Sequence, residues 1–196
     1  DRRQRQMCIR DRVDPEVRAA VQRAIELLVS AGARVEPVEL ASPDEQNRML
    51  GVIVSAELAE IHATWVESRA SDYSPELLNW IQRSAELKAA RLSAAMRARR
   101  ASIRAADQLM RNYDALVGPT TPHVAPAAEV PDMGLFTESF DLNGLPALSV
   151  PCGFTQAGLP IGLKIVGRRW GERTVLRIGD AYQQLTDWHR RRPPVE

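Results

Sequence analysis

The feature that most constrains this chain is a long uncharged run that is interrupted too often to form one helix. No charged residue occurs between Leu142 and Leu163, a length that would suit a membrane-spanning helix. The run contains several helix breakers: Pro146, Pro151, Pro160, Gly144, Gly153, Gly158 and Gly162. Because prolines and glycines at this density mark turns, the run predicts strands and turns, not a membrane span.

Two strands joined by a tight turn are predicted within this run. Aliphatic and β-branched residues fill 148–151 and 159–167, and the turn Thr155–Gly158 separates them. This arrangement is typical of a β-hairpin. A third, short buried strand is predicted at Ala115–Val117, and the Pro-rich residues 119–134 that follow are predicted to form a loop.

Helical patterns surround these strands. Asp14, Pro15 and an acidic first turn favour a helix start, and apolar residues then recur at helical spacing as far as Gly32. Residues 34–40 approximate strand alternation, and Pro37 would place that strand at a sheet edge because it lacks an amide N–H. Alternating helices and strands predict an α/β fold. Further helical stretches are predicted over 42–68, 74–113 and 172–188, the second with fraying near Arg83–Glu86.

The balance of charge argues against a nucleic-acid partner. The chain has 26 basic and 25 acidic residues, a net charge of +1, whereas phosphate-binding surfaces usually need a clear basic excess. Arg97, Arg100 and Arg104 lie close together on a predicted helix. They could form an RNA-binding face, but we favour a solvated helix surface.

The cysteine content points to a reducing compartment. Cys8 and Cys152 are the two cysteines of the chain, too few for a disulfide framework. A charged segment followed by an apolar one, the pattern of a secretory signal, is not visible. We therefore expect a cytoplasmic protein.

Motifs for metal or cofactor binding are not found. His62, His123 and His189 lie far apart in the sequence, without the paired spacing of metal ligands. Phosphate-binding and dinucleotide-binding glycine loops are also missing from the sequence. We therefore predict no metal and no cofactor.

A nucleophile with its base is equally hard to find. The serines do not occur in a glycine-flanked nucleophile elbow. Cys152 follows a predicted strand and His123 lies in the Pro-rich loop, so a Cys–His hydrolase is one hypothesis. A thiolate needs a nearby base or dipole to lower its pKa, and we favour a buried structural cysteine.

Polar residues gather in the turn before the hairpin. Asp141, Asn143 and Gly144 precede a predicted strand, and polar turns at strand ends often supply binding groups in α/β proteins. Ordinary turn chemistry explains the same residues equally well. Lys88 and Arg99 fall on the apolar stripe of the 74–113 helical stretch, where a cation is either snorkelled or paired, or points into a polar cavity.

Two runs of the sequence resemble the C-terminal half of the amidase signature family. They are YDALVGPTTP, from Tyr113 to Pro122, and LNGLPALSVPCGFTQAGLPIGLKIVGRRWGE, from Leu142 to Glu172. The order of elements around them also matches, so the resemblance covers residues 13–193. We treat that range as the C-terminal segment of an amidase domain, and residues 1–12 as a tail of separate origin.

The resemblance implies a fold and a reaction. The fold would be part of an α/β/α layered sandwich around a mixed sheet. The reaction would be hydrolysis of carboxamide C–N bonds by a serine that acts through a second serine, in a cis peptide, and a lysine. In the family those residues belong to the N-terminal half, and no residue here matches them. No catalytic residue is therefore assigned, and the chain alone is expected to be inactive.

The resemblance also implies substrate-side residues. Arg99 matches a family arginine on the helix before the first run, and Thr120 and Thr121 match a strand-end loop. Asp141 stands where family members commonly have asparagine, which replaces an amide donor by a carboxylate, and Asn143 lies in the same turn. We predict these five as substrate-binding residues.

Two functions remain open at this point. The first is the C-terminal part of an amidohydrolase with a small-molecule amide substrate. The alternative is a non-catalytic assembly module, such as part of one of the subunits of a glutamyl-tRNA amidotransferase. We expect no membrane partner. The open sheet edge and apolar surface predicted for 114–167 lead us to expect self-association as a homo-oligomer.

Overall fold

The computed structural model describes residues 13–126 and 136–192, so the 1–12 tail and the second half of the 119–134 loop lie outside the described residues. The described elements are α2 (Pro15–Ser30), α3 (Pro43–Arg69), η1 (Ala70–Asp72), α4 (Pro75–Ala85), α5 (Ala89–Leu109), β1 (Ala115–Pro119), α6 (Glu138–Asn143), β2 (Ala147–Phe154), β3 (Pro160–Gly167), α7 (Glu172–Gln184) and η2 (Trp188–Arg190). The α/β class is confirmed.

A three-stranded sheet forms the centre of the fold. The strand order is β1-β3-β2, and both pairings are antiparallel. The predicted hairpin is confirmed, with the N–H of Thr155 donating to Leu159 O and that of Gly158 to Thr155 O. Where the resemblance implies a mixed sheet, the described strands are antiparallel throughout.

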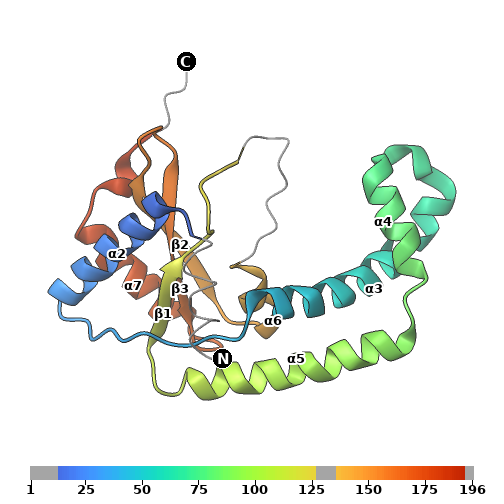
Figure 1. Ribbon diagram of the computed structural model, residues 1–196, viewed down its shortest axis with the longest axis horizontal. Helices are drawn as coiled ribbons and strands as arrows, with labels where there is room; N and C mark the ends of the chain where they lie inside the picture. Colours follow the sequence, from blue (N-terminus) through green and yellow to red (C-terminus); the bar gives the residue numbers. More distant parts are fainter. Residues whose placement is uncertain (1–12, 127–135, 193–196) are drawn as a thin grey trace.

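Helices α2 and α7 cover one face of this sheet (Figure 1). The core between them is aliphatic: Leu163 and Ile165 of β3 are fully buried, as is Tyr182 of α7. They pack with Val17 and Ala20 of α2. This burial explains the apolar spacing that predicted both helices.

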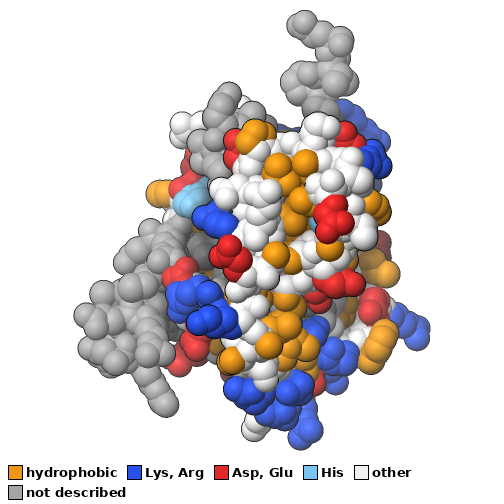
Figure 2. Space-filling model, turned by 90° about the vertical axis from the view of Figure 1, so that its right-hand side faces the viewer, with side chains coloured by type: hydrophobic (Ala, Val, Ile, Leu, Met, Phe, Trp, Pro, Cys, Tyr) orange, Lys and Arg blue, Asp and Glu red, His pale blue; other side chains and the backbone are white. Residues whose placement is uncertain are grey.

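Helices α3, α4 and α5 form a long arm that extends away from the sheet (Figure 1). One cluster, in which Ile53, Ala95 and Leu142 are buried, joins α3, α5 and α6 at the base of the arm. Towards the outer end, Ile61, Trp65 and Trp80 are exposed. Figure 2 looks onto this end, where hydrophobic side chains run down the middle with charged groups around them.

By length and composition, the stretch Pro43–Asp72 is apolar enough to cross a bilayer, with a mean hydropathy of 1.3 over its best 18-residue window. One helix that meets these two criteria does not establish a membrane span.

One expectation from the sequence is wrong, and a second is incomplete. Residues 33–42 form no strand; Pro37 cannot complete a ladder, and the segment is held instead by the Tyr113 hydroxyl, which donates to Glu36 at 2.5 Å. The 74–113 helical stretch is two helices, because the chain turns between α4 and α5. Lys88 stands at that break and is exposed, so it does not face the core.

Candidate functional site

The turn that leads from α6 into β2 is built around a short helix that the sequence analysis missed. Helix α6 ends at Gly144, whose φ of 65° is left-handed, a conformation that favours glycine at a helix end. The Gly144 N–H donates to Asp141 O at 3.1 Å. The polar residues of this turn are therefore placed by a helix terminus, next to the start of a strand.

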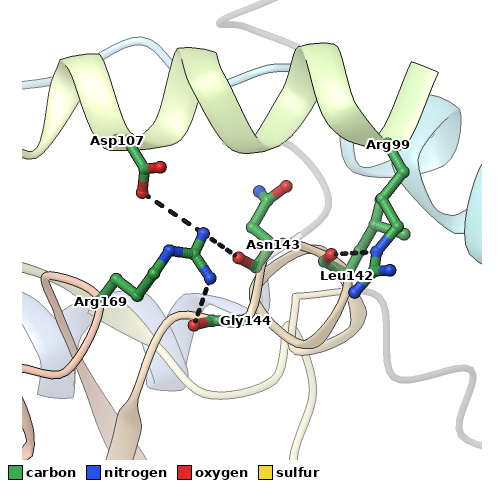
Figure 3. A network of polar contacts seen from close by, with 6 residues as sticks. All are labelled: Arg99, Asp107, Leu142, Asn143, Gly144 and Arg169. Atoms are coloured by element: carbon green, nitrogen blue, oxygen red, sulfur yellow. Dashed lines mark hydrogen bonds and ion pairs between the residues drawn. The ribbon is translucent and has the colours of Figure 1, made fainter. Parts of the chain in front are cut away.

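Two arginines from distant parts of the chain hold this turn (Figure 3). Arg99 of α5 donates through Nε to Leu142 O at 2.9 Å. Arg169, from the turn after β3, donates to Asn143 O at 2.7 Å and to Gly144 O at 3.4 Å. Asp107 of α5 contacts the Arg169 guanidinium at 3.4 Å. The carbonyl groups at a helix C-terminus carry partial negative charge, so both cations stabilise the end of α6.

The inward orientation expected for Arg99 agrees with its half-buried position and its bond to α6. Through that bond it positions the turn. A direct role in substrate binding remains a prediction.

The side chains of Asn143 and Asp141 belong to the same helix, α6, but have different surroundings. Asn143 is 5% exposed, and its side chain extends towards α5 (Figure 3). Its Oδ1 atom has no hydrogen-bond partner within the described part of the chain. Asp141 is exposed, and its charge acts on the buried Lys164 of β3.

The hydroxyl groups of Thr120 and Thr121, which follow β1, have different partners. The Thr120 hydroxyl lies 2.7 Å from the Ser149 hydroxyl of β2, and both sit over Gly162 of β3, where an added Cβ would come within 2.7 Å of each oxygen. The Thr121 hydroxyl instead donates to His123 O at 2.6 Å. Thr120 thus belongs to the sheet face opposite α2 and α7, whereas Thr121 shapes the following loop.

Lys164 is the functional candidate that the sequence analysis missed. It lies on β3 opposite Ser149 of β2 and Gly118 of β1 and is 6% exposed. Its Nζ donates to Phe136 O and lies 4.3 Å from the centre of the Phe140 ring. Burial lowers the pKa of Lys164 to about 8, and the negative charge of Asp141 offsets part of this shift by raising the pKa. A lone lysine inside an apolar strand was the signal for it.

A cavity of about 1350 Å³ opens beside Lys164. Its wall is mostly apolar and comes from α2, α3, α5, α6, β1 and β3. Among its polar lining residues are Lys164, Asn143, Ser139 and Gln46. Of the five predicted substrate-binding residues, Asn143 alone lines this cavity; Arg99 and Asp141 flank it through α6, and the two threonines lie outside its lining.

The structure does not support the Cys–His hypothesis. Cys152 is 3% exposed, and burial raises the pKa of its thiol to about 11, so the reactive thiolate is disfavoured. His123 is exposed and contacts Asp14 at 3.2 Å. Within the described residues, no cluster of three or more potential metal ligands occurs.

Comparison with known proteins decides the family. The sequence profile named Amidase matches residues 5–176. The chain belongs to the amidase family.

Two curated relatives show how much of a family member this chain covers. It is 35% identical to a glutamyl-tRNA(Gln) amidotransferase subunit of Roseiflexus sp. (strain RS-1), over 94% of this chain and 44% of that protein. It is 31% identical to an amidase of Pseudomonas putida, over 94% of this chain and 42% of that protein. The chain thus spans less than half the length of the curated relatives it matches.

Solved structures agree with this assignment. One is an inhibitor-bound structure of a vestigial protein complex that is described as revealing the evolutionary origins of an s-triazine catabolic enzyme. The present chain superposes on it with a TM-score of 0.83 at 26% identity, and the match covers 94% of this chain and 42% of the other. A crystal structure of an amidase gives 0.80 at 25% identity, over 88% and 42%. The described fold is therefore part of the amidase signature fold.

Proposed function

We propose that this chain is the C-terminal part of an amidohydrolase that cleaves carboxamide C–N bonds through an acyl-serine intermediate. The match to the Amidase family over residues 5–176 carries this proposal. The reactive serine and its lysine lie outside this chain. The chain supplies strands, covering helices and one wall of the substrate pocket.

The predicted substrate-binding residues fit this role in two ways. Asn143 reaches the cavity directly. Arg99 fixes the carbonyl of Leu142, next to Asn143 on α6. We propose that Arg99, Asp141 and Asn143 shape the pocket wall for a small-molecule amide, and that Thr120 and Thr121 contact the substrate outside this lining. A buried free thiol at Cys152 agrees with a reducing compartment such as the cytoplasm.

Ammonia release from simple carboxamides tests this proposal. The 196-residue chain should show no turnover, whereas the intact protein that carries it should hydrolyse at least one amide of the panel. Cys152→Ala serves as the control variant and should change neither result. Clear turnover by the chain alone that Cys152→Ala abolishes would instead establish a cysteine hydrolase.

A second candidate function rests on the 35% identity to one of the subunits of an amidotransferase. Arg97, Arg100 and Arg104 are all exposed on α5 and would supply an RNA contact. This candidate predicts tRNA binding that weakens steeply between about 50 and 200 mM salt and that is lost when the three arginines become glutamine. Because the net charge is only +1, we expect no such binding in an electrophoretic shift assay.

A further inference from the structure

Lys164 is a buried cation without an acidic partner among the described residues. It is 6% exposed, and its contacts are a backbone carbonyl, Phe136 O, and the ring of Phe140. Within the described part of the chain, no carboxylate lies within ion-pair distance of its Nζ. Asp141 acts on it only as a more distant charge.

The buried charge of Lys164, unpaired among the described residues, lowers the stability of the folded protein unless an anion binds to it. Lysines are almost never fully buried unless they are paired, because a buried charge loses its hydration. An ammonium group has three N–H donors, and one carbonyl oxygen satisfies only one of them. The face of Phe140 attracts the cation but accepts no ordinary hydrogen bond.

Two further buried side chains, each with an unsatisfied oxygen, line the same cavity. Asn143 is 5% exposed and Gln46 is 7% exposed, and both line the cavity together with Lys164. Their side-chain oxygens, Oδ1 and Oε1, have no partner among the described residues. Buried polar atoms are normally hydrogen-bonded, so these two amides mark a place where a polar ligand would be held.

The remainder of the wall limits where an anion can sit. Glu39 and Glu45 also line the cavity and would repel a carboxylate placed beside them. Arg18 is the other cation of the lining, but it is exposed and donates to Val13 O. Lys164 is therefore the buried position for the charged end of a ligand, and the apolar residues of the wall suit a short hydrocarbon chain.

We propose that Lys164 binds the carboxylate of a ligand in this cavity, with Asn143 and Gln46 hydrogen-bonding to a polar group further along the same molecule. The inference rests on the proposed function, since it makes that ligand an amide substrate carrying a carboxylate. Lys164 then determines specificity by favouring acidic over neutral amides, because a charge-assisted hydrogen bond is stronger than a neutral one.

Amine labelling tests the binding step without needing turnover. The chain has only two lysines, Lys88 and Lys164, and exposed Lys88 serves as the internal reference. The intact protein is treated at about pH 8 with a limiting acetylating reagent in the presence of butanoate or butanamide, and peptides are quantified by mass spectrometry. Butanoate should lower labelling of Lys164 relative to Lys88 about fivefold, which corresponds to a pKa rise of about one unit.

Butanamide has the same length without the charge and should leave the ratio unchanged. Equal protection by both compounds, or by neither, would overturn the proposal. Ligand-observed NMR gives a second measurement: the affinity for butanoate should fall about tenfold in Lys164→Met, the loss expected for one charge-assisted hydrogen bond. The affinity should not change in Lys88→Met, and an unchanged affinity in Lys164→Met would also overturn the proposal.

Hydrolysis then separates this inference from the proposed function. The ratio of kcat/KM for succinamate to that for butanamide should fall about tenfold in Lys164→Met. If the intact protein hydrolyses no amide of the panel, these two included, but butanoate protects Lys164, the proposed function fails and the carboxylate site stands. If it hydrolyses both amides with an unchanged ratio, the site fails and the amidohydrolase stands.

Discussion

The two faces of the central sheet differ although they come from the same strands. On one face, Ile161, Leu163 and Ile165 of β3 are sealed beneath α2 and α7. On the other face, the intervening residues of β3 are Gly162, Lys164 and Val166. Of these three, Val166 is buried in an apolar cluster that also contains Met110 and Leu145.

This difference separates stability from chemistry within one strand. Alternate residues of a strand point to opposite faces, so β3 can fill a dry core with one set and leave a lysine beside a cavity with the other. The sealed face should tolerate little change in volume. The cavity face should respond mainly to changes in charge.

The largest effect is expected from a deletion on the sealed face. Leu163 is 0% exposed, and Leu163→Ala should lower the free energy of unfolding by about 2–5 kcal/mol, through lost burial and the cavity that remains. Denaturant unfolding measures this. Leu176→Ala, at a leucine of α7 that is 61% exposed, is the control and should cost less than about 1 kcal/mol. Equal losses in the two variants would show that the face is not sealed.

A smaller effect is expected where α7 approaches β2. A Cβ added at Gly179 would lie 2.4 Å from Leu148 Cδ2, so Gly179→Ala should destabilise the fold by about 1–3 kcal/mol through overpacking. Gly51→Ala is the matched helical control: nothing lies within 4 Å of its new Cβ, and it should stabilise by about 0.5–1 kcal/mol. Thermal melting of both variants checks the pair, and stabilisation by Gly179→Ala would contradict the close packing.

The smallest effect is expected from the charge on the cavity face. Burial lowers the pKa of Lys164 from 10.5 to about 8, so between these values the unfolded chain binds a proton that the folded chain has lost. Stability from this group therefore rises with pH above about 8, by about 1 kcal/mol per pH unit. Below about pH 8 both states are protonated and its contribution is constant.

The difference in unfolding free energy between wild type and Lys164→Met isolates this contribution. Burial also raises the pKa of Cys152 to about 11, so the folded protein loses stability from this thiol as pH rises above about 9. That effect is common to both proteins and cancels in the difference. A difference that stays flat between about pH 7.5 and 9.5 would show that the lysine is solvated.

Much of the fold followed from local patterns in the sequence. The hairpin was predictable because glycines and prolines bracket two aliphatic runs, and α2 because its apolar spacing and Asp14–Pro15 start agree. The strand expected over 34–40 did not form, since alternation alone cannot supply a neighbouring strand to pair with. Helix α6 is only six residues long and depends on distant arginines, so no local pattern revealed it.

The site was less predictable than the fold. The resemblance named Arg99 and the polar turn named Asn143, but their surroundings depend on contacts between residues far apart in the sequence. The Arg99 partner, for example, lies 43 residues away. Lys164 matches no catalytic residue of the family, and its importance comes from burial, which the sequence alone does not display. Substrate roles for the five predicted residues stay predictions.

The two arginines around α6 also limit how the molecule can move. Arg99 belongs to the helical arm and Arg169 to the turn between the sheet and α7, yet they bind the consecutive carbonyl groups of Leu142, Asn143 and Gly144. Rotation of the arm relative to the sheet must therefore break at least one of these hydrogen bonds. Any hinge between the two parts has to lie farther out, beyond Arg99.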